Sequence, residues 1–168
     1  GGLWRNRIAL GENAPVKDVD LRIALEDWVH LPKDLANSFR LTIPHQRYLA
    51  ASFLHNFEAD PCLVLEEINP CGEVPIEIAL VKNWEEPSEV VKTSNLGFSQ
   101  VADDGDNIWV TDAFMKDIEN KTMTLCHCNN ARDWRRHNKY LQRFEKDLYK
   151  DWQRVVPDKF WHTFACIT

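Results

Sequence analysis

The sequence NARDWRRHNKYLQRFEKDLYKDWQRVV, residues 130–156, is the stretch from which the prediction of the fold starts. Its large apolar residues recur at spacings of three, four and seven, which places them on one face of a helix that turns about 100° per residue. Asn130 is a suitable N-cap and Pro157 ends the pattern. We therefore predict a long amphipathic helix over about 130–156 whose aromatic face packs on the core. The residues of that face are Trp134, Leu141, Phe144, Leu148, Trp152 and Val155.

The opposite face of this predicted helix carries a line of basic side chains, which we call the basic stripe. Its members are Arg132, Arg136, Lys139, Arg143, Lys146, Lys150 and Arg154. Residues 131–156 contain eight Lys and Arg and four Asp and Glu, a net charge of +4, whereas the whole chain has a net charge of −6. An ordinary solvated helix face explains the stripe, and so does a binding site for phosphates or for an acidic partner.

Length and composition predict one globular domain. A chain of 168 residues is long enough for a substantial core, and its seven Trp and eight Phe indicate large aromatic contacts. The pI near 5.5 argues against indiscriminate binding of nucleic acid by the whole surface. The chain starts Gly-Gly and ends in the apolar run FWHTFACIT, so we expect that it is part of a longer protein.

The apolar runs and the cysteines predict a location inside the cell. No apolar run approaches the roughly 20 residues that span a bilayer, and no secretory signal is present. The five Cys form an odd set without a CxxC pair, which is typical of free thiols in a reducing compartment. We expect an intracellular protein, in the cytoplasm or the nucleus, that does not bind membranes.

Alternation of apolar and polar residues predicts short strands. The segment 62–81 predicts a β-hairpin with Asn69-Pro70-Cys71-Gly72 as a type I turn, and Pro75 predicts a free edge or a bulge in its second strand. Residues 112–119 fit a helix or a strand equally well. Further strands are expected within 4–10, 19–26, 38–43, 96–101, 108–110, 122–128 and 160–167, a short helical turn within 31–36, and a second helix near 44–57.

These elements together predict the α+β class. The expected architecture is a largely antiparallel, curved sheet of about eight short strands, with the helix of residues 130–156 packed across one face.

The hairpin turn also resembles an enzyme loop. Asn69-Pro70-Cys71-Gly72-Glu73 is similar to the radical-cysteine loop of ribonucleotide reductases, especially of the cobalamin-dependent class. The resemblance implies that Cys71 is the site of a thiyl radical and that Asn69 and Glu73 hold the substrate ribose. It covers only this loop and its flanks, and nothing else here supplies the family's large barrel or its reducing cysteine pair. A hairpin turn accounts for the same Asn, Pro and Gly.

Two other clusters suggest chemistry without the pattern that the chemistry needs. In a strand, Cys126 and Cys128 share a face while His127 points the other way, so the three cannot converge on one metal ion. The acidic segment 103–107 lacks the ligand layout of an EF-hand and reads as a solvated turn. We therefore predict no metal site and no cofactor. A nucleophilic pair such as Cys62 with His162 stays open.

Three functional hypotheses follow. The preferred one is a non-enzymatic binding or assembly domain that contacts a partner through the basic stripe or an exposed hairpin edge. The second is a nucleic-acid or nucleotide-binding domain, in which the stripe contacts phosphates and exposed aromatics such as Trp84 or Trp109 stack on bases. The third is a cysteine-dependent enzyme centred on Cys71. The sequence does not decide between an acidic protein and a nucleic acid as the partner, nor does it give the oligomeric state.

Overall fold

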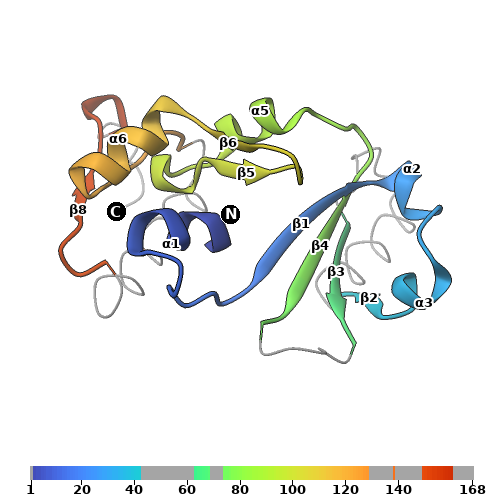
Figure 1. Ribbon diagram of the computed structural model, residues 1–168. Helices are drawn as coiled ribbons and strands as arrows, with labels where there is room; N and C mark the ends of the chain where they lie inside the picture. Colours follow the sequence, from blue (N-terminus) through green and yellow to red (C-terminus); the bar gives the residue numbers. More distant parts are fainter. Residues whose placement is uncertain (1, 43–62, 69–73, 129–137, 139–148, 161–168) are drawn as a thin grey trace. The chain divides into compact units, whose positions relative to one another are not determined.

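The structure, a computed structural model, describes residues 2–42, 63–68, 74–128, 138 and 149–160 (Figure 1). The described residues belong to the α+β class, and the chain divides into two compact units. Unit 1 consists of Leu3–Ala14 and Glu85–Thr168, and unit 2 consists of Pro15–Trp84. Each unit is described by itself.

Unit 2 contains a four-stranded mixed sheet in the order β1-β4-β3-β2. β1 (Val19–Ala24) is parallel to β4 (Ile76–Val81), whereas β3 (Leu63–Glu67) is antiparallel to both β4 and β2 (Phe39–Leu41). The short helices α2 (Leu25–Trp28) and α3 (Lys33–Ala36) lie between β1 and β2 in the sequence. The period-two alternation therefore predicts these strands and the β3–β4 pairing correctly.

The predicted free edge at Pro75 is wrong. β4 begins directly after Pro75 and lies between β1 and β3, so both of its edges are paired. Pro75 has no N–H to donate, but its carbonyl oxygen accepts a hydrogen bond of 3.0 Å from the Val19 N–H. Proline thus precedes the central strand rather than interrupting it.

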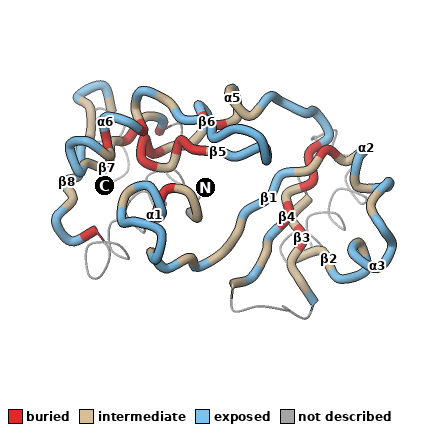
Figure 2. The backbone as a smooth tube through the Cα atoms, in the orientation of Figure 1, coloured by how far each residue is buried: buried red, intermediate tan, exposed pale blue. Residues whose placement is uncertain are grey.

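Unit 1 is built from short helices and two small sheets around an aromatic core. β5 and β6 form an antiparallel pair, and β7 and β8 form a parallel pair. Leu96, Phe98, Met123, Leu125 and Tyr149 are buried together at its centre, and Figure 2 shows buried residues in both units. Its elements are α1 (Gly2–Leu10), α5 (Pro87–Val90), η1 (Val91–Thr93), η2 (Gly97–Ser99), β5 (Val101–Asp103), β6 (Ile108–Val110), α6 (Asp112–Asn120), β7 (Thr122–Thr124), β8 (Gln153–Val155) and η3 (Asp158–Phe160).

The long helix predicted over 130–156 is wrong at its C-terminal end. Tyr149 and the two residues after it form a turn, closed by a hydrogen bond of 2.9 Å from the Trp152 N–H to the Tyr149 carbonyl. Gln153–Val155 then form β8, which pairs with β7. The apolar spacing of Trp152 and Val155 fits a turn followed by a strand as well as it fits a helix. Residues 129–137 and 139–148 lie outside the described part, where Asn138 alone is described, as helical.

The single curved sheet is also wrong, because the eight described strands form three separate sheets and two of the pairings are parallel. Residues 4–10 are helical rather than extended. Gly11, at φ +95°, ends α1 and donates its N–H to the Arg7 carbonyl, as a left-handed glycine after a helix does. The second predicted helix, near 44–57, lies outside the described residues, as does the strand expected within 160–167 apart from Phe160, which ends the 3-10 helix η3.

Asp117 joins α6 to β7 and to the loop before β5. Its side chain is 1% exposed and accepts hydrogen bonds from the Thr122 hydroxyl, the Thr124 hydroxyl and the Thr124 N–H, at 2.6, 2.6 and 3.0 Å. Gly97 packs against the same carboxylate, and a Cβ at Gly97 would lie 2.5 Å from Asp117 Oδ2. These contacts fix α6 against η2 and β7, and the first residues of α6, Asp112 and Ala113, line the pocket described next.

Candidate functional site

The basic stripe lies mostly outside the described residues. Lys150 lies in the turn after Tyr149, and Arg154 lies in β8, so these two residues do not share a helix face. The structure gives no position for the other five members, and binding by them remains a prediction. They are Arg132, Arg136, Lys139, Arg143 and Lys146.

The sequence-predicted cysteine sites are also outside the described part of the chain. The loop of Asn69, Cys71 and Glu73 is not described, nor are Cys62 and His162. In the described ranges, no group of three or more His, Cys, Asp or Glu residues is arranged to hold a metal ion. In the same ranges, no helix combines the length and the apolar composition needed to cross a bilayer.

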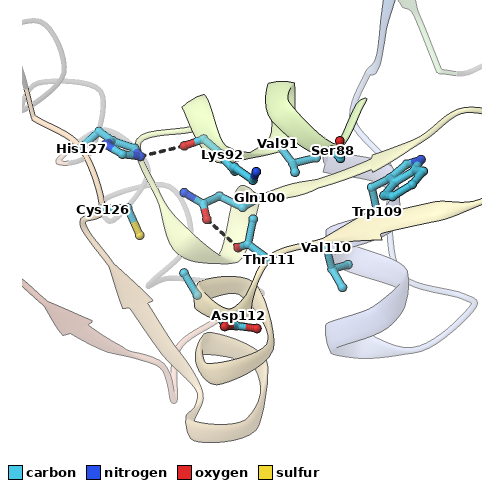
Figure 3. Close-up of a pocket in the computed structure, with 11 residues that line it drawn as sticks. Ser88, Val91, Lys92, Gln100, Trp109, Val110, Thr111, Asp112, Cys126 and His127 are labelled. Atoms are coloured by element: carbon cyan, nitrogen blue, oxygen red, sulfur yellow. Dashed lines mark hydrogen bonds between the residues drawn. The ribbon is translucent and has the colours of Figure 1, made fainter. Parts of the chain in front are cut away.

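A pocket of about 560 Å³ opens in unit 1 (Figure 3). Ser88, Val91 and Lys92, from α5 and η1, form one wall, and β6 with the first turn of α6 forms the other. Trp109 stands at one end, whereas Cys126 and His127 stand at the opposite end. The volume is within the range of small-ligand sites, roughly 300–1,000 Å³. The pocket can therefore accept one or two side chains of a partner or a small molecule.

The tip of the β5–β6 hairpin fixes the ring of Trp109. Asp104 Oδ1 accepts hydrogen bonds from the N–H groups of Asp106 and Asn107, at 3.0 and 2.7 Å. Asp104 Oδ2 accepts a hydrogen bond of 2.6 Å from Trp109 Nε1. The bond from Trp109, followed by those from the turn backbone, lowers the pKa of Asp104. The indole, which is 37% exposed, is thus oriented before any ligand arrives.

The strand beside this ring has an unpaired backbone edge. Asp104 donates its N–H to the Asn107 carbonyl and Thr111 donates its N–H to the Gln100 carbonyl. Because hydrogen-bonded pairs alternate along an antiparallel ladder, Trp109 bonds to β5, while Ile108 and Val110 turn their N–H and C=O groups outward. Among the described strands, β6 pairs with β5 alone, and the side chains of all three of its residues are exposed.

A chain of hydrogen bonds fixes the part of the pocket wall where β6 leads into α6. The Thr111 hydroxyl donates to Gln100 Oε1 at 2.6 Å and accepts from the Phe114 N–H, which makes Thr111 the N-cap of α6. The amide of Gln100, which is buried, donates to the Ser94 carbonyl at 3.0 Å. These polar groups satisfy one another, so the wall is preformed.

The thiol at the far end of the pocket is not an activated nucleophile. Burial, and then the charge of Asp117, raises the pKa of Cys126, so the thiol is protonated at neutral pH. The neighbouring His127 lies 2.7 Å, through Nε2, from the Lys92 carbonyl, an acceptor to which that nitrogen donates its proton. Cys128 is buried in the core. The described geometry at this end therefore suits packing and polar contact.

The pocket lining contains one carboxylate, Asp112, and one lysine, Lys92. Lys92, the basic residue of the lining, forms an ion pair of 2.6 Å with Glu89. Because Lys92 is paired and Asp112 has no ion-pair partner among the described residues, the lining suits a neutral or basic ligand better than a phosphate.

No protein-family model and no curated protein matches this chain. The functional conclusion therefore rests on the geometry of the site.

Sequence reasoning found part of this site. It named Trp109 as an exposed aromatic, and Trp109 is exposed. Trp84, which was named with it, is exposed too but lies in unit 2, outside this site. Sequence reasoning also predicted the strand Ile108–Val110 and the polar turn before it. It missed the pocket, because α5, β6 and residues 126–127 come together around it through tertiary packing that no local pattern encodes. The signal in the sequence that pointed to this site was the run of three apolar residues, Ile108–Val110, directly after the acidic turn of residues 103–107.

Proposed function

We propose that the protein is a non-enzymatic binding domain that takes an extended segment of a partner protein onto β6 and the adjoining pocket. The single observation that supports the proposal is the combination of an outward backbone edge at Ile108 and Val110 with a fixed, exposed Trp109. Edge strands recruit extended peptides by continuing the ladder, and adjacent pockets select side chains. The hairpin of residues 62–81, whose edge the preferred hypothesis named, has no free edge at β4, so this proposal uses a different edge, that of β6.

The exposed side chains of β6 give such a partner apolar surface to cover. Three consecutive large apolar residues on a solvent-facing strand are a liability unless something binds there, because an open apolar edge promotes aggregation. Trp109 is a suitable anchor, since aromatic residues dominate the binding energy of protein interfaces and its rotamer is already restrained by Asp104.

The other two hypotheses have less support from the pocket. A cysteine nucleophile needs a lowered pKa or a base, whereas the pKa of Cys126 is raised. A nucleotide needs cationic groups for its phosphates, whereas the one lysine of the pocket lining, Lys92, is paired with Glu89. Nucleic-acid binding by the basic stripe is a separate proposal, and its test is given in the Discussion.

A library of random peptides displayed on phage tests the proposed function, when it is selected for binding to the full chain. We expect enriched peptides that bind with micromolar affinity and lose about 30-fold or more on Trp109→Ala, the cost of a central aromatic anchor. Trp84→Ala, which removes an exposed indole from unit 2, is the matched control and should leave affinity unchanged. Failure to enrich peptides, or equal binding to Trp109→Ala, contradicts the proposal.

A further inference from the structure

The pocket beside β6 holds a carboxylate that the described fold does not use. Asp112 is exposed in the first turn of α6 and has no hydrogen-bond or ion-pair partner through its side chain among the described residues. The two carboxylates of the hairpin tip are occupied. Asp103 accepts hydrogen bonds from Trp4 Nε1 and the Gly105 N–H, and Asp104 accepts three.

The aromatic ring and the carboxylate come from two consecutive elements that line the same pocket. Trp109 lies in β6 and Asp112 opens α6, and both are drawn among the lining residues in Figure 3. An indole face attracts a cation through its quadrupole, and a carboxylate attracts it directly. Ala113, which also lines the pocket, adds apolar surface for the methylene stem of a long side chain.

We infer that the partner segment, if the proposed function holds, carries a Lys or Arg side chain that enters this pocket between Trp109 and Asp112. The inference rests on the proposed function and adds the chemistry of the occupant. Asp112 is the one carboxylate of the pocket lining, and the one lysine of that lining, Lys92, is already paired with Glu89, so the lining favours a basic occupant.

The pleat of β6 determines where the basic residue lies in the segment. Ile108 and Val110 share one face of β6, and Trp109 points to the other. A segment that continues the sheet places the residue opposite Trp109 on the face of the Trp109 side chain, while its two neighbours cover Ile108 and Val110. The recognised pattern is therefore apolar, basic, apolar.

The probe is the pentapeptide acetyl-Thr-Val-Lys-Val-Thr-amide, compared with versions that carry norleucine or glutamate in place of the lysine. Norleucine keeps the aliphatic stem and removes the charge. Titration into the full ¹⁵N-labelled chain should give tighter binding of the lysine peptide than of the norleucine peptide, by roughly fivefold to tenfold, and weaker binding still of the glutamate peptide. Asp112→Asn should abolish the preference for lysine while leaving the affinity for norleucine unchanged.

Glu119→Gln is the matched control, because it removes the same charge from an exposed position of the same helix and lies outside the pocket lining. It should leave the preference for lysine intact. Equal binding of the lysine and norleucine peptides, or a preference for lysine that survives Asp112→Asn, overturns this inference and leaves the proposed function standing. If no peptide shifts the amide signals of Ile108 and Val110 and the phage selection also fails, the proposed function itself falls.

Discussion

Tyr149 donates a hydrogen bond of 2.7 Å through Oη to Asn6 Oδ1, and both residues are buried although they are 143 positions apart in the sequence. Arg5 Nε donates to the same oxygen at 3.1 Å, and the Arg5 guanidinium lies 5.0 Å from the centre of the Phe98 ring. The tyrosine ring also packs edge-on against Phe98 and Trp152. This contact joins α1 to the segment before β8 and closes the core of unit 1.

Tyr149→Phe should lower the free energy of unfolding by about 1–2 kcal/mol, because it removes the buried hydrogen bond from the Tyr149 hydroxyl to Asn6 Oδ1. Urea unfolding at neutral pH measures the loss. An unchanged midpoint would show that the bond does not stabilise unit 1.

Alkaline unfolding should depend on the same hydroxyl. Burial raises the pKa of Tyr149 above the usual value of about 10, an effect that Arg5 partly opposes. The folded state therefore holds the proton more tightly than the unfolded chain does. The resulting stability is complete below about pH 10 and is lost as the pH rises through the folded pKa. Tyr149→Phe should make the unfolding midpoint less dependent on pH above 10, which urea titrations at pH 8, 10 and 11 would detect.

Gly97→Ala should destabilise unit 1 by about 1–3 kcal/mol, the usual cost of overpacking a well-packed site. The new methyl would lie 2.5 Å from Asp117 Oδ2 and 3.1 Å from the Ala113 carbonyl oxygen, and the latter is backbone that cannot move aside alone. Thermal unfolding measures the effect. Gly105→Ala serves as the control, since no atom lies within 4 Å of its added Cβ and only its φ of +97° opposes the change. A smaller loss at Gly97 than at Gly105 would contradict the packing of Asp117.

Glu77 makes unit 2 sensitive to mildly acidic pH. Burial, followed by the charges of Asp20, Asp18 and Glu66, raises the pKa of this carboxyl, and Lys17 opposes the shift. Asp20 and Glu66 are its direct cross-strand neighbours in β1 and β3. Since the folded pKa exceeds the unfolded one, stability is greatest below the unfolded pKa, near 4.3, and falls as the pH rises through the folded value.

Glu77→Gln should therefore raise the urea midpoint at pH 7 and flatten its change above the unfolded pKa, near pH 4.3. Glu26→Gln, an exposed position of α2, is the control and should leave the pH profile unchanged. If the Glu77→Gln protein is less stable than the parent at pH 7, the carboxylates of Asp20 and Glu66 do not repel that of Glu77 enough to destabilise the folded state.

The basic stripe makes a separate prediction. If Arg136 and Arg143 contact phosphates, binding of single-stranded RNA or DNA should weaken steeply as salt rises, and Arg136→Glu with Arg143→Glu should abolish it. Fluorescence anisotropy with a labelled oligonucleotide at 50 and 200 mM salt tests this. Absence of binding at the lower concentration would remove the nucleic-acid hypothesis. Lys116→Glu, an exposed reversal on α6, controls for net charge.

Local patterns predicted the strands of unit 2 because a half-buried strand repeats every two residues, as Val19–Ala24 and Ile76–Val81 do. They failed for α1, where the deciding features are the left-handed Gly11 and a buried Arg5–Asn6–Tyr149 network. They also failed for residues 149–155, because an apolar spacing of three or four does not distinguish a helix from a turn that leads into a strand. Strand partners such as β7 and β8 lie 29 residues or more apart, and only tertiary packing selects them.

Amide hydrogen exchange of β6, with and without a selected peptide, tests the central claim most directly. The N–H groups of Ile108 and Val110 point away from β5, whereas that of Trp109 already bonds to it. We predict that a bound peptide slows exchange at Ile108 and Val110 and changes Trp109 little. Protection at Trp109 alone, or protection confined to residues outside β6 and the pocket, would contradict the account.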